Sequence, residues 1–169
     1  MQVSEKTADD VLANNMRQAM RRLAASVVIV TASDGANRYA MAATASTSVS
    51  MDPPSMLVCV NRGASIYPVL EKQDYFCITI LGHRHHEISV ACSNKARREE
   101  RFAVGNWQTD PETGTPFLAD APANLICARA ELHAYGSHGI FIGRVKSIRL
   151  HGTVTPLVYI DGRYTTTHE

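Results

Sequence analysis

Hydrophobic positions along this chain fall into short stretches, and most of these stretches have the length and composition of β-strands. They are rich in β-branched and aromatic residues, and turn-forming segments such as Ser33-Asp34-Gly35 and Asp161-Gly162 interrupt them. The strands expected from this pattern cover residues 26–32, 39–49, 56–61, 75–81, 123–134, 139–150 and 156–164. Met51-Asp52-Pro53-Pro54 breaks the pattern because proline donates no main-chain hydrogen bond, and residues 107–120, which also contain proline and glycine, are expected to be irregular.

Apolar residues three and four positions apart predict a helix over residues 7–25, with Thr7 as its N-cap. Its apolar stripe consists of Leu12, Met16, Met20 and Leu23. Shorter helices are expected over residues 65–72, where Ser65 can act as the cap, and over residues 83–93. The apolar face of the last of these helices is formed by Ile88, Ala91 and Cys92.

Strands dominate this order and the helices are short insertions, which favours a mainly β barrel over a regular βαβ series. The length of 169 residues suits one domain with one sizeable core, so we expect a single domain over residues 1–169. Residues 1–16 form an N-terminal extension and the start of the first helix. Hydrophobic residues make up 45% and charged residues 20% of the chain, which is typical of a globular protein.

Charge and cysteine usage narrow the class of partner and the compartment. The formal net charge is +1, so nucleic acid is not an expected partner. No apolar run approaches the roughly 20 residues that span a bilayer, and the polar, acidic N-terminus does not resemble a signal peptide, so we expect a cytoplasmic protein without a membrane partner. Cys59, Cys77 and Cys127 lie in apolar runs and are expected to be buried thiols of a reducing compartment.

Residues 42–50 (AATASTSVS) are the first candidate for a binding segment. Five of these nine residues carry a hydroxyl group and three of the others are alanine. Small side chains let a ligand approach the main chain, and hydroxyl groups donate the hydrogen bonds that a phosphate requires. The alternative is that serine and threonine simply alternate on the exposed face of a strand.

Residues 61–65 (NRGAS) are a second candidate anion site, because they end a strand and open a helix next to the fixed charge of Arg62. An exposed turn with an ordinary serine cap explains the same residues. The basic residues Lys95, Arg97, Arg98 and Arg101 could bind an anionic partner or the phosphates of NAD(P)H. Because Glu99 and Glu100 offset their charge, residues 95–105 are expected to form a solvated, charged loop or helical turn instead. The spacing of His83, His85 and His86 fits no common metal motif, so we expect no metal site, and Arg84 between them favours a solvated helix start.

Five stretches, taken in order, resemble the flavin reductase-like family. They are residues 22–31 (RLAASVVIVT), 41–54 (MAATASTSVSMDPP), 61–65 (NRGAS), 136–145 (GSHGIFIGRV) and 156–164 (PLVYIDGRY). The similarity extends from about Arg17 to Thr165. Members of this family are small components that supply reduced flavin to two-component monooxygenases. The resemblance implies an FMN-binding split β-barrel of Greek-key type with short peripheral helices, assembled as a homodimer with the flavin at or near the dimer interface.

The resemblance also assigns roles to individual residues. It implies that His138 lies near the nicotinamide as the catalytic residue, and that Thr44, Ala45 and Ser46 lie along the isoalloxazine ring. The ribityl or phosphate end would contact Ser48, Ser50, Arg62 and Ser65, while Arg163 and Tyr164 would close the pocket. The remaining cofactor-binding residues implied by the resemblance are Met41, Val49, Asn61 and Phe102.

The sequence departs from the family pattern at three positions. Ser137 stands where many members carry Asp, which removes a carboxylate beside His138. Ala40 and Ala42 stand where Gly and Thr are frequent, and the second change removes a possible phosphate donor.

The implied activity is transfer of hydride from NADH or NADPH to FMN or FAD, followed by diffusion of the reduced flavin to a partner monooxygenase. Arg62, Arg144 and Arg163 are each candidate partners for the 2′-phosphate of NADPH. Two alternatives remain. The chain could be a reductase with tightly bound FMN that serves another small acceptor such as a corrinoid, or a flavin-binding carrier without turnover.

Overall fold

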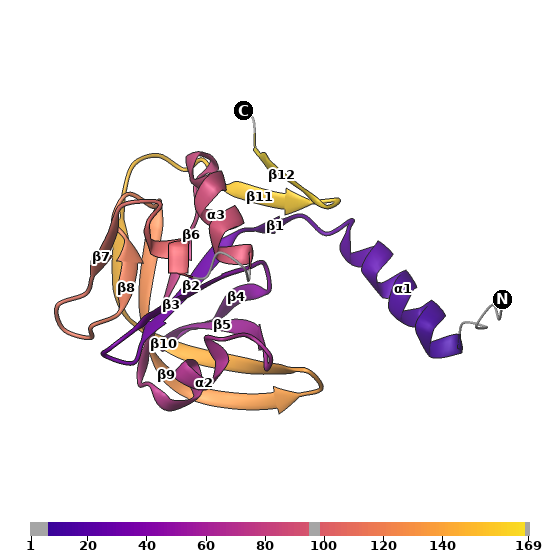
Figure 1. Ribbon diagram of the computed structural model, residues 1–169, viewed down its shortest axis with the longest axis horizontal. Helices are drawn as coiled ribbons and strands as arrows, with labels where there is room; N and C mark the ends of the chain where they lie inside the picture. Colours follow the sequence, from indigo (N-terminus) through magenta and orange to yellow (C-terminus); the bar gives the residue numbers. More distant parts are fainter. Residues whose placement is uncertain (1–6, 95–98, 168–169) are drawn as a thin grey trace.

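The computed structural model describes residues 7–94 and 99–167, and a curved antiparallel sheet forms its body (Figure 1). The sheet has seven strands in the order β3-β2-β6-β9-β10-β5-β4. Their bounds are Val28–Ser33 for β2, Arg38–Ala43 for β3, Ser46–Met51 for β4, Pro54–Asn61 for β5, Tyr75–Ile80 for β6, Ala123–Tyr135 for β9 and His138–Leu150 for β10. The expectation of a mainly β protein with short helices is confirmed, while closure of the barrel and dimerisation stay predictions.

The two edge strands of this sheet, β3 and β4, are consecutive in the chain. Thr44 and Ala45 join them, and the main-chain carbonyl of Ala45 accepts a hydrogen bond from the N–H of Cys59 at 2.9 Å. The prediction of one continuous strand over residues 39–49 is therefore wrong. The chain bends after Ala43 and leaves one edge of the sheet for the other, and the curvature brings β3 into contact with β5.

Two core clusters cover the two faces of β2, which explains why that strand is buried along most of its length. Val28 and Val30 pack into one cluster with the helix α2 (Tyr67–Lys72), whereas Ile29 packs into the other with the helix α3 (His86–Ser93). Side chains alternate between the faces of a strand, so a run of consecutive apolar residues requires packing on both sides.

Close packing against β10 depends on two glycines. A Cβ at Gly139 would lie 2.7 Å from the ring of Tyr67, and one at Gly143 would lie 2.5 Å from Cζ of Phe76. Both aromatic rings are buried in the first cluster. Each glycine therefore lets an aromatic side chain lie directly on the strand.

Two small sheets complete the body. One pairs β1 (Ala25–Ser26) and β12 (Arg163–Thr166) with β11 (Leu157–Ile160), and the turn between β11 and β12 falls at Asp161-Gly162, as predicted. The other pairs β7 (Trp107–Thr109) with β8 (Pro116–Leu118), so residues 107–120 are not wholly irregular. The short helices η1 (His83–His85) and η3 (Glu99–Phe102) flank α3.

The N-terminal helix α1 (Ala8–Met20) projects away from the body, and none of its residues is buried (Figure 1). Thr7 caps it in a capping box with Asp10, as the sequence predicts, but the helix ends at Met20 rather than continuing to Ala25. Its base is held by Arg21, whose guanidinium lies 2.9 Å from the carboxylate of Asp161. The expected apolar stripe is exposed at Leu12, Met16, Met20 and Leu23.

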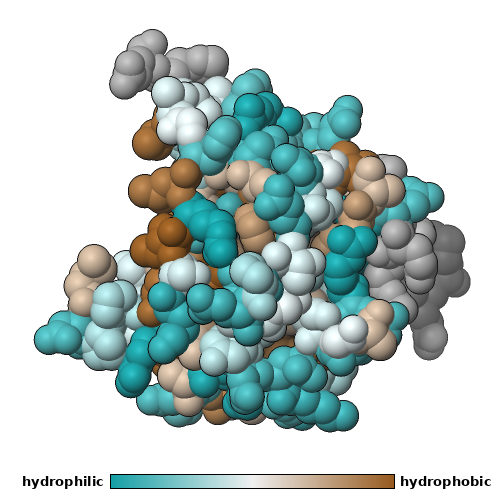
Figure 2. Space-filling view, turned by 90° about the vertical axis from the view of Figure 1, so that its left-hand side faces the viewer, coloured by the Kyte–Doolittle hydropathy of each residue, from teal (hydrophilic) through white to brown (hydrophobic). Residues whose placement is uncertain are grey.

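The side of the body that faces away from α1 is shown in Figure 2. It is predominantly hydrophilic, with apolar side chains gathered along one vertical edge.

Three local predictions need correction. Ser65 does not cap α2, whose N-cap is Ile66 and makes no side-chain capping bond. Cys59 is only half-buried, although Cys77 and Cys127 are buried as predicted. Residues 95–98 of the predicted charged loop lie outside the described residues, and Arg101 is 6% exposed rather than solvated.

Candidate flavin site

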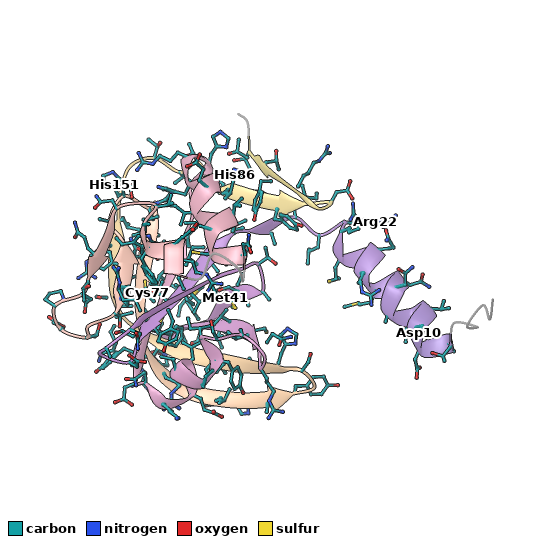
Figure 3. All side chains as sticks on the ribbon, in the orientation of Figure 1. Asp10, Arg22, Met41, Cys77, His86 and His151 are labelled. Atoms are coloured by element: carbon teal, nitrogen blue, oxygen red, sulfur yellow. The ribbon has the colours of Figure 1, made fainter. Side chains whose placement is uncertain are left out.

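Three neighbouring cavities lie side by side along the strand β3, and each has residues of this strand in its lining. The largest, here the Met41 cavity, has a volume of about 620 Å³ and lies between β3, the end of β5 and α3. Its described lining residues are Met41, Ala42, Asn61, Gly63, Ala64, Ser65, Ile66, Cys92, Ser93 and Arg101. The Tyr164 cavity, of about 300 Å³, shares Ala42 and Ser93 with it, and the Arg38 cavity, of about 380 Å³, shares Ser65 and Arg101 with it. Met41 lies near the middle of the body, away from α1 (Figure 3).

The main chain of β3 is open on the side that faces these cavities. In the hairpin with β2, the N–H of Asp34 donates to the carbonyl of Asn37 at 3.2 Å, and hydrogen-bonded pairs alternate along an antiparallel ladder. With the register Thr31↔Ala40 and Ile29↔Ala42, the main-chain groups of Ala40 and Ala42 point away from β2. The main-chain N–H and C=O groups of these two residues therefore lie along a free sheet edge, and the side chains of both residues are only methyl groups.

Arg101 occupies the wall between the Met41 and Arg38 cavities. Its guanidinium donates to the main-chain carbonyl of Ala40 on the free edge of β3, and to the carbonyl of Asn94 at 3.2 Å. This arginine therefore links the end of α3 to the edge strand. It also places a positive charge, nearly removed from solvent, beside two cavities whose described lining residues include no acid.

The Tyr164 cavity is walled by α3 and the small sheet. The hydroxyl of Ser89 donates to the hydroxyl of Tyr164 at 2.9 Å, and the ring of Tyr164 meets those of His86 and Tyr159 edge to face. These contacts fix the aromatic wall opposite Ala42.

In the Met41 cavity, burial raises the pKa of the Cys92 thiol to about 12, so this thiol is protonated and a poor nucleophile.

His138 begins β10 at the tip of the β9–β10 hairpin and pairs with Asn61, which lines the Met41 cavity. Its Nδ1 lies 2.9 Å from the hydroxyl of Ser137, the residue that replaces the usual carboxylate. The N–H of Arg62 donates to the carbonyl of Ser137 at 2.9 Å, which ties the hairpin tip to the segment after β5. His138 is exposed and stands next to the cavity without lining it.

The structure gathers only part of the predicted site around these cavities. Six predicted residues line them: Met41, Thr44, Asn61, Ser65, Phe102 and Tyr164. Those that line none of the three are Ala45, Ser46, Ser48, Val49, Ser50, Arg62, His138 and Arg163. Two of the predicted hydroxyl donors have structural partners, since Ser46 donates to the carbonyl of Leu57 at 3.0 Å and Ser50 accepts from the N–H of Asp52 at 3.0 Å.

Sequence reasoning missed several lining residues on and after α3, namely Ser89, Cys92, Ser93 and Arg101. The apolar face predicted for α3 does include Cys92, and the serines occupy neighbouring positions on the same helix. The periodicity of that helix was therefore a usable signal. For Arg101, anion binding was the alternative, but its run of charged neighbours favoured a solvated segment.

A separate polar cluster surrounds His85, which is 3% exposed rather than part of a solvated helix start. Its Nδ1 accepts the N–H of Gly82 at 3.1 Å, and its Nε2 lies 3.4 Å from the carboxylate of Asp120. Burial lowers the pKa of His85 below its usual value of 6.5, because the charged ring is poorly solvated there. Within residues 7–94 and 99–167, no group of His, Cys, Asp and Glu has the arrangement of a metal site.

Comparison with known proteins assigns the family. The model of the flavin reductase like domain matches residues 20–168. The FMN reductase (NADH) RutF of Agrobacterium fabrum is 42% identical over 148 residues, covering 88% of this chain and 84% of the relative. The reductase component of the FADH(2)-dependent resorcinol hydroxylase of a Rhizobium species is 38% identical over 159 residues, covering 93% and 88%. The chain belongs to the flavin reductase-like family.

Solved structures agree with this assignment. BorF, the flavin reductase component of a bacterial two-component tryptophan halogenase, superposes with a TM-score of 0.85 at 29% identity, covering 93% of this chain and 99% of BorF. The NADH:FAD oxidoreductase SgcE6 of Streptomyces globisporus, in complex with NAD and FAD fragments, gives a TM-score of 0.87 at 25% identity, covering 96% and 97%. In the described part of this chain, no helix has the length and apolar character needed to cross a bilayer.

Proposed function

We propose that this chain is an NADH-dependent flavin reductase that binds its flavin in the Met41 and Tyr164 cavities. The observation that carries the site is the free edge of β3, where the main-chain groups of Ala42 face both cavities. A flavin ring carries several hydrogen-bonding groups along one edge, and an open strand edge offers complementary donors and acceptors. The volume of the Met41 cavity, about 620 Å³, lies within the range of roughly 300–1,000 Å³ common for small-molecule sites.

The residues present fit a flavin in chemistry as well as in size. Bound flavin supplies the acceptor for a hydride carried by reduced nicotinamide, so the protein needs neither a nucleophile nor a strong acid. Ala42 and Thr44 hold the polar edge of the ring, and Tyr164 covers it. Ser65 and Arg101 hold the phosphate on the side of the Met41 cavity that adjoins the Arg38 cavity, with a hydroxyl group and a positive charge.

His138 is proposed to orient the nicotinamide. The pairing of β10 with β5 supports this, because it holds His138 beside Asn61 at the margin of the Met41 cavity. The contact with Ser137 fixes the ring without giving it a carboxylate partner. His138→Asn should raise the KM for NADH and lower kcat about tenfold or more, as expected for loss of a positioning contact. An unchanged NADH KM and kcat would remove His138 from the site.

A homodimer accounts for the exposed stripe of α1. Val11, Leu12, Met16, Met20 and Leu23 are each about half exposed or more, and a helix with one apolar face gains stability by covering it. Sedimentation should show a dimer, and Leu12→Ser together with Met16→Ser should shift it toward monomer. The four free cysteines are consistent with a reducing, cytoplasmic location.

The partner is proposed to be a flavin-dependent oxygenase that receives reduced flavin by diffusion. This proposal is supported by two relatives, the reductase components of a resorcinol hydroxylase and of a tryptophan halogenase. If flavin is a substrate that leaves after reduction, we expect oxidised flavin to bind weakly to moderately. The open cavities along β3 permit such exchange.

One assay separates this function from its alternatives. Purified protein is mixed with NADH under anaerobic conditions, and oxidation at 340 nm is followed with and without free FMN or FAD. If the protein is a flavin reductase, the rate of NADH oxidation increases with the concentration of added flavin. A corrinoid reductase with bound FMN is coloured after purification and responds to its own acceptor instead, while a carrier binds flavin without oxidising NADH.

A further inference from the structure

The residue that precedes α3 is a buried histidine, which lines none of the three cavities along β3. His85 is 3% exposed, and α3 begins at the next residue, His86. The Nδ1 atom of His85 accepts the N–H of Gly82 at 3.1 Å, and the main-chain N–H of His85 donates to the carbonyl of Gly82 at 2.9 Å. The ring therefore closes the turn that leads into α3. Only an unprotonated Nδ1 can do this, because a ring nitrogen that carries a proton cannot accept a hydrogen bond.

The first two turns of α3 hold the aromatic wall of the Tyr164 cavity. The ring of His86 meets that of Tyr164 edge to face, with the ring centroids 4.7 Å apart (Figure 3). The hydroxyl of Ser89 donates to the hydroxyl of Tyr164 at 2.9 Å, and both Ser89 and Ser93 line the cavity. A displacement at the start of α3 therefore moves the groups that fix the position of Tyr164.

Three other elements place charged or titratable groups around the His85 ring. The carboxylate of Asp120, in the segment after β8, lies 3.4 Å from Nε2, and Nε of Arg84 lies 3.3 Å from the same atom. His151, which follows β10, lines a cavity of about 210 Å³ together with these three residues. Burial favours the neutral ring most strongly, Arg84 and His151 act in the same direction, and Asp120 opposes them. The folded protein therefore holds a neutral ring at neutral pH.

We propose that His85 is a positioning residue of the flavin site, whose neutral ring holds the start of α3 and whose protonation releases it. A proton taken from solvent at Nδ1 turns the bond with Gly82 into a contact between two donors. The turn before α3 then opens, and Tyr164 loses its fixed position. Because the pKa of His85 lies below 6.5, flavin affinity should be full above pH 6.5 and decrease as the pH falls below it. This inference rests on the proposed flavin reductase function.

The test compares flavin affinity at pH 8 and at pH 5.5, a range in which histidine changes charge. Riboflavin is the probe, because it lacks the phosphate of FMN, whose second pKa of about 6 falls in the same range. His85→Gln is the informative variant, since glutamine can accept the N–H of Gly82 through its side-chain carbonyl but does not titrate. His133→Gln is the matched control, because His133 is an exposed histidine of β9 outside the three cavities.

The dissociation constant is followed by flavin fluorescence. Wild type should bind riboflavin about 2- to 12-fold more weakly at pH 5.5 than at pH 8, as expected for loss of one hydrogen bond at the cavity wall. His133→Gln should show the same change, whereas His85→Gln should bind equally well at both pH values. Equal binding by wild type at both pH values, or an unaltered pH dependence in His85→Gln, would overturn the inference and leave the proposed function intact.

Amide hydrogen exchange tests the release of α3 in the absence of flavin. Exchange of residues 83–93 is read by mass spectrometry and corrected for its intrinsic pH dependence. At pH 5.5 this segment should exchange faster in wild type than in His85→Gln, while β2 and β6 exchange equally in both. Equal exchange of residues 83–93, or faster exchange in every segment, would refute a local release. If the segment behaves as expected but wild type binds neither riboflavin nor FMN at pH 8, the proposed function fails and the control of α3 by His85 stands.

Discussion

Ala42→Leu tests whether the small side chains of β3 serve to expose its main chain. Ala42 lines both the Met41 and Tyr164 cavities, and its main-chain N–H and C=O point to the free edge. Ala42 also packs against the core cluster that contains Ile29 and Cys92, so part of the leucine side chain meets packed atoms. We therefore expect the free energy of unfolding to fall by about 1–3 kcal/mol, as is common when a larger side chain enters a packed position.

Flavin affinity should fall as well. If the larger side chain holds the flavin away from the strand, both main-chain hydrogen bonds of Ala42 are lost. Each is worth about 0.5–1.5 kcal/mol net, which gives a total of about 1–3 kcal/mol and a rise in Kd of about 5- to 150-fold. The substitution adds no charge and removes no polar group, so a weaker affinity reports the approach to the main chain.

The assay is a titration of FMN and FAD against protein fluorescence, combined with thermal unfolding of the same samples. Ala130→Leu, on an exposed position of β9 outside the three cavities, is the matched control and should leave Kd unchanged. Wild-type affinity in a folded Ala42→Leu variant would refute the claim that flavin lies against the edge of β3.

Three further predictions concern the scaffold. Gly143→Ala should lower the free energy of unfolding in urea by about 1–3 kcal/mol, because its Cβ would lie 2.5 Å from the ring of Phe76; an unchanged midpoint would contradict this contact. Burial lowers the pKa of His85 below 6.5, so the unfolded chain binds a proton at this residue more readily than the folded protein does. The contribution of His85 to the free energy of unfolding should therefore be present above pH 6.5 and decrease as the pH falls below it. His85→Gln should flatten this pH dependence. Burial raises the pKa of Cys77, Cys92 and Cys127 to about 12, whereas Cys59 is only half-buried. Iodoacetamide at pH 8 should therefore label Cys59 first in the native protein, as followed by mass spectrometry, and an equal labelling rate at all four thiols would contradict this.

Local patterns predicted most strands because their residues report burial directly. The apolar run of β2 correctly indicated a strand covered on both faces, and Asp161-Gly162 correctly indicated a turn. The break at Thr44-Ala45 could not be predicted in this way. Small, hydroxyl-rich residues are compatible with a continuous strand, and only the pairing of β3 with β2 and of β4 with β5 separates them.

For the candidate site, which stays a proposal, the sequence and the structure point to neighbouring parts of the chain for different reasons. The sequence pointed to residues 42–50 because of their side chains, whereas the structure draws attention to the main chain of β3 just before most of them. Hydroxyl groups of β4 such as those of Ser46 and Ser50 satisfy neighbouring main-chain groups instead. Side-chain chemistry is visible in a sequence, but the direction of a main-chain carbonyl depends on the register of two strands.

Arg101 illustrates why the remaining residues of the candidate site could not be predicted from the sequence. Its sequence surroundings are charged and predict solvation, yet it is buried, and its guanidinium donates to the carbonyl of Ala40 on the free edge. Ala42, two residues further along the same edge, has no such partner among the described hydrogen bonds. The protein thus satisfies the carbonyl of Ala40 with its own arginine, while the main-chain groups of Ala42 face the Met41 and Tyr164 cavities. Under the proposed function, alanine in place of threonine at position 42 would leave recognition to the main chain of the strand, which a sequence comparison alone would score only as a lost donor.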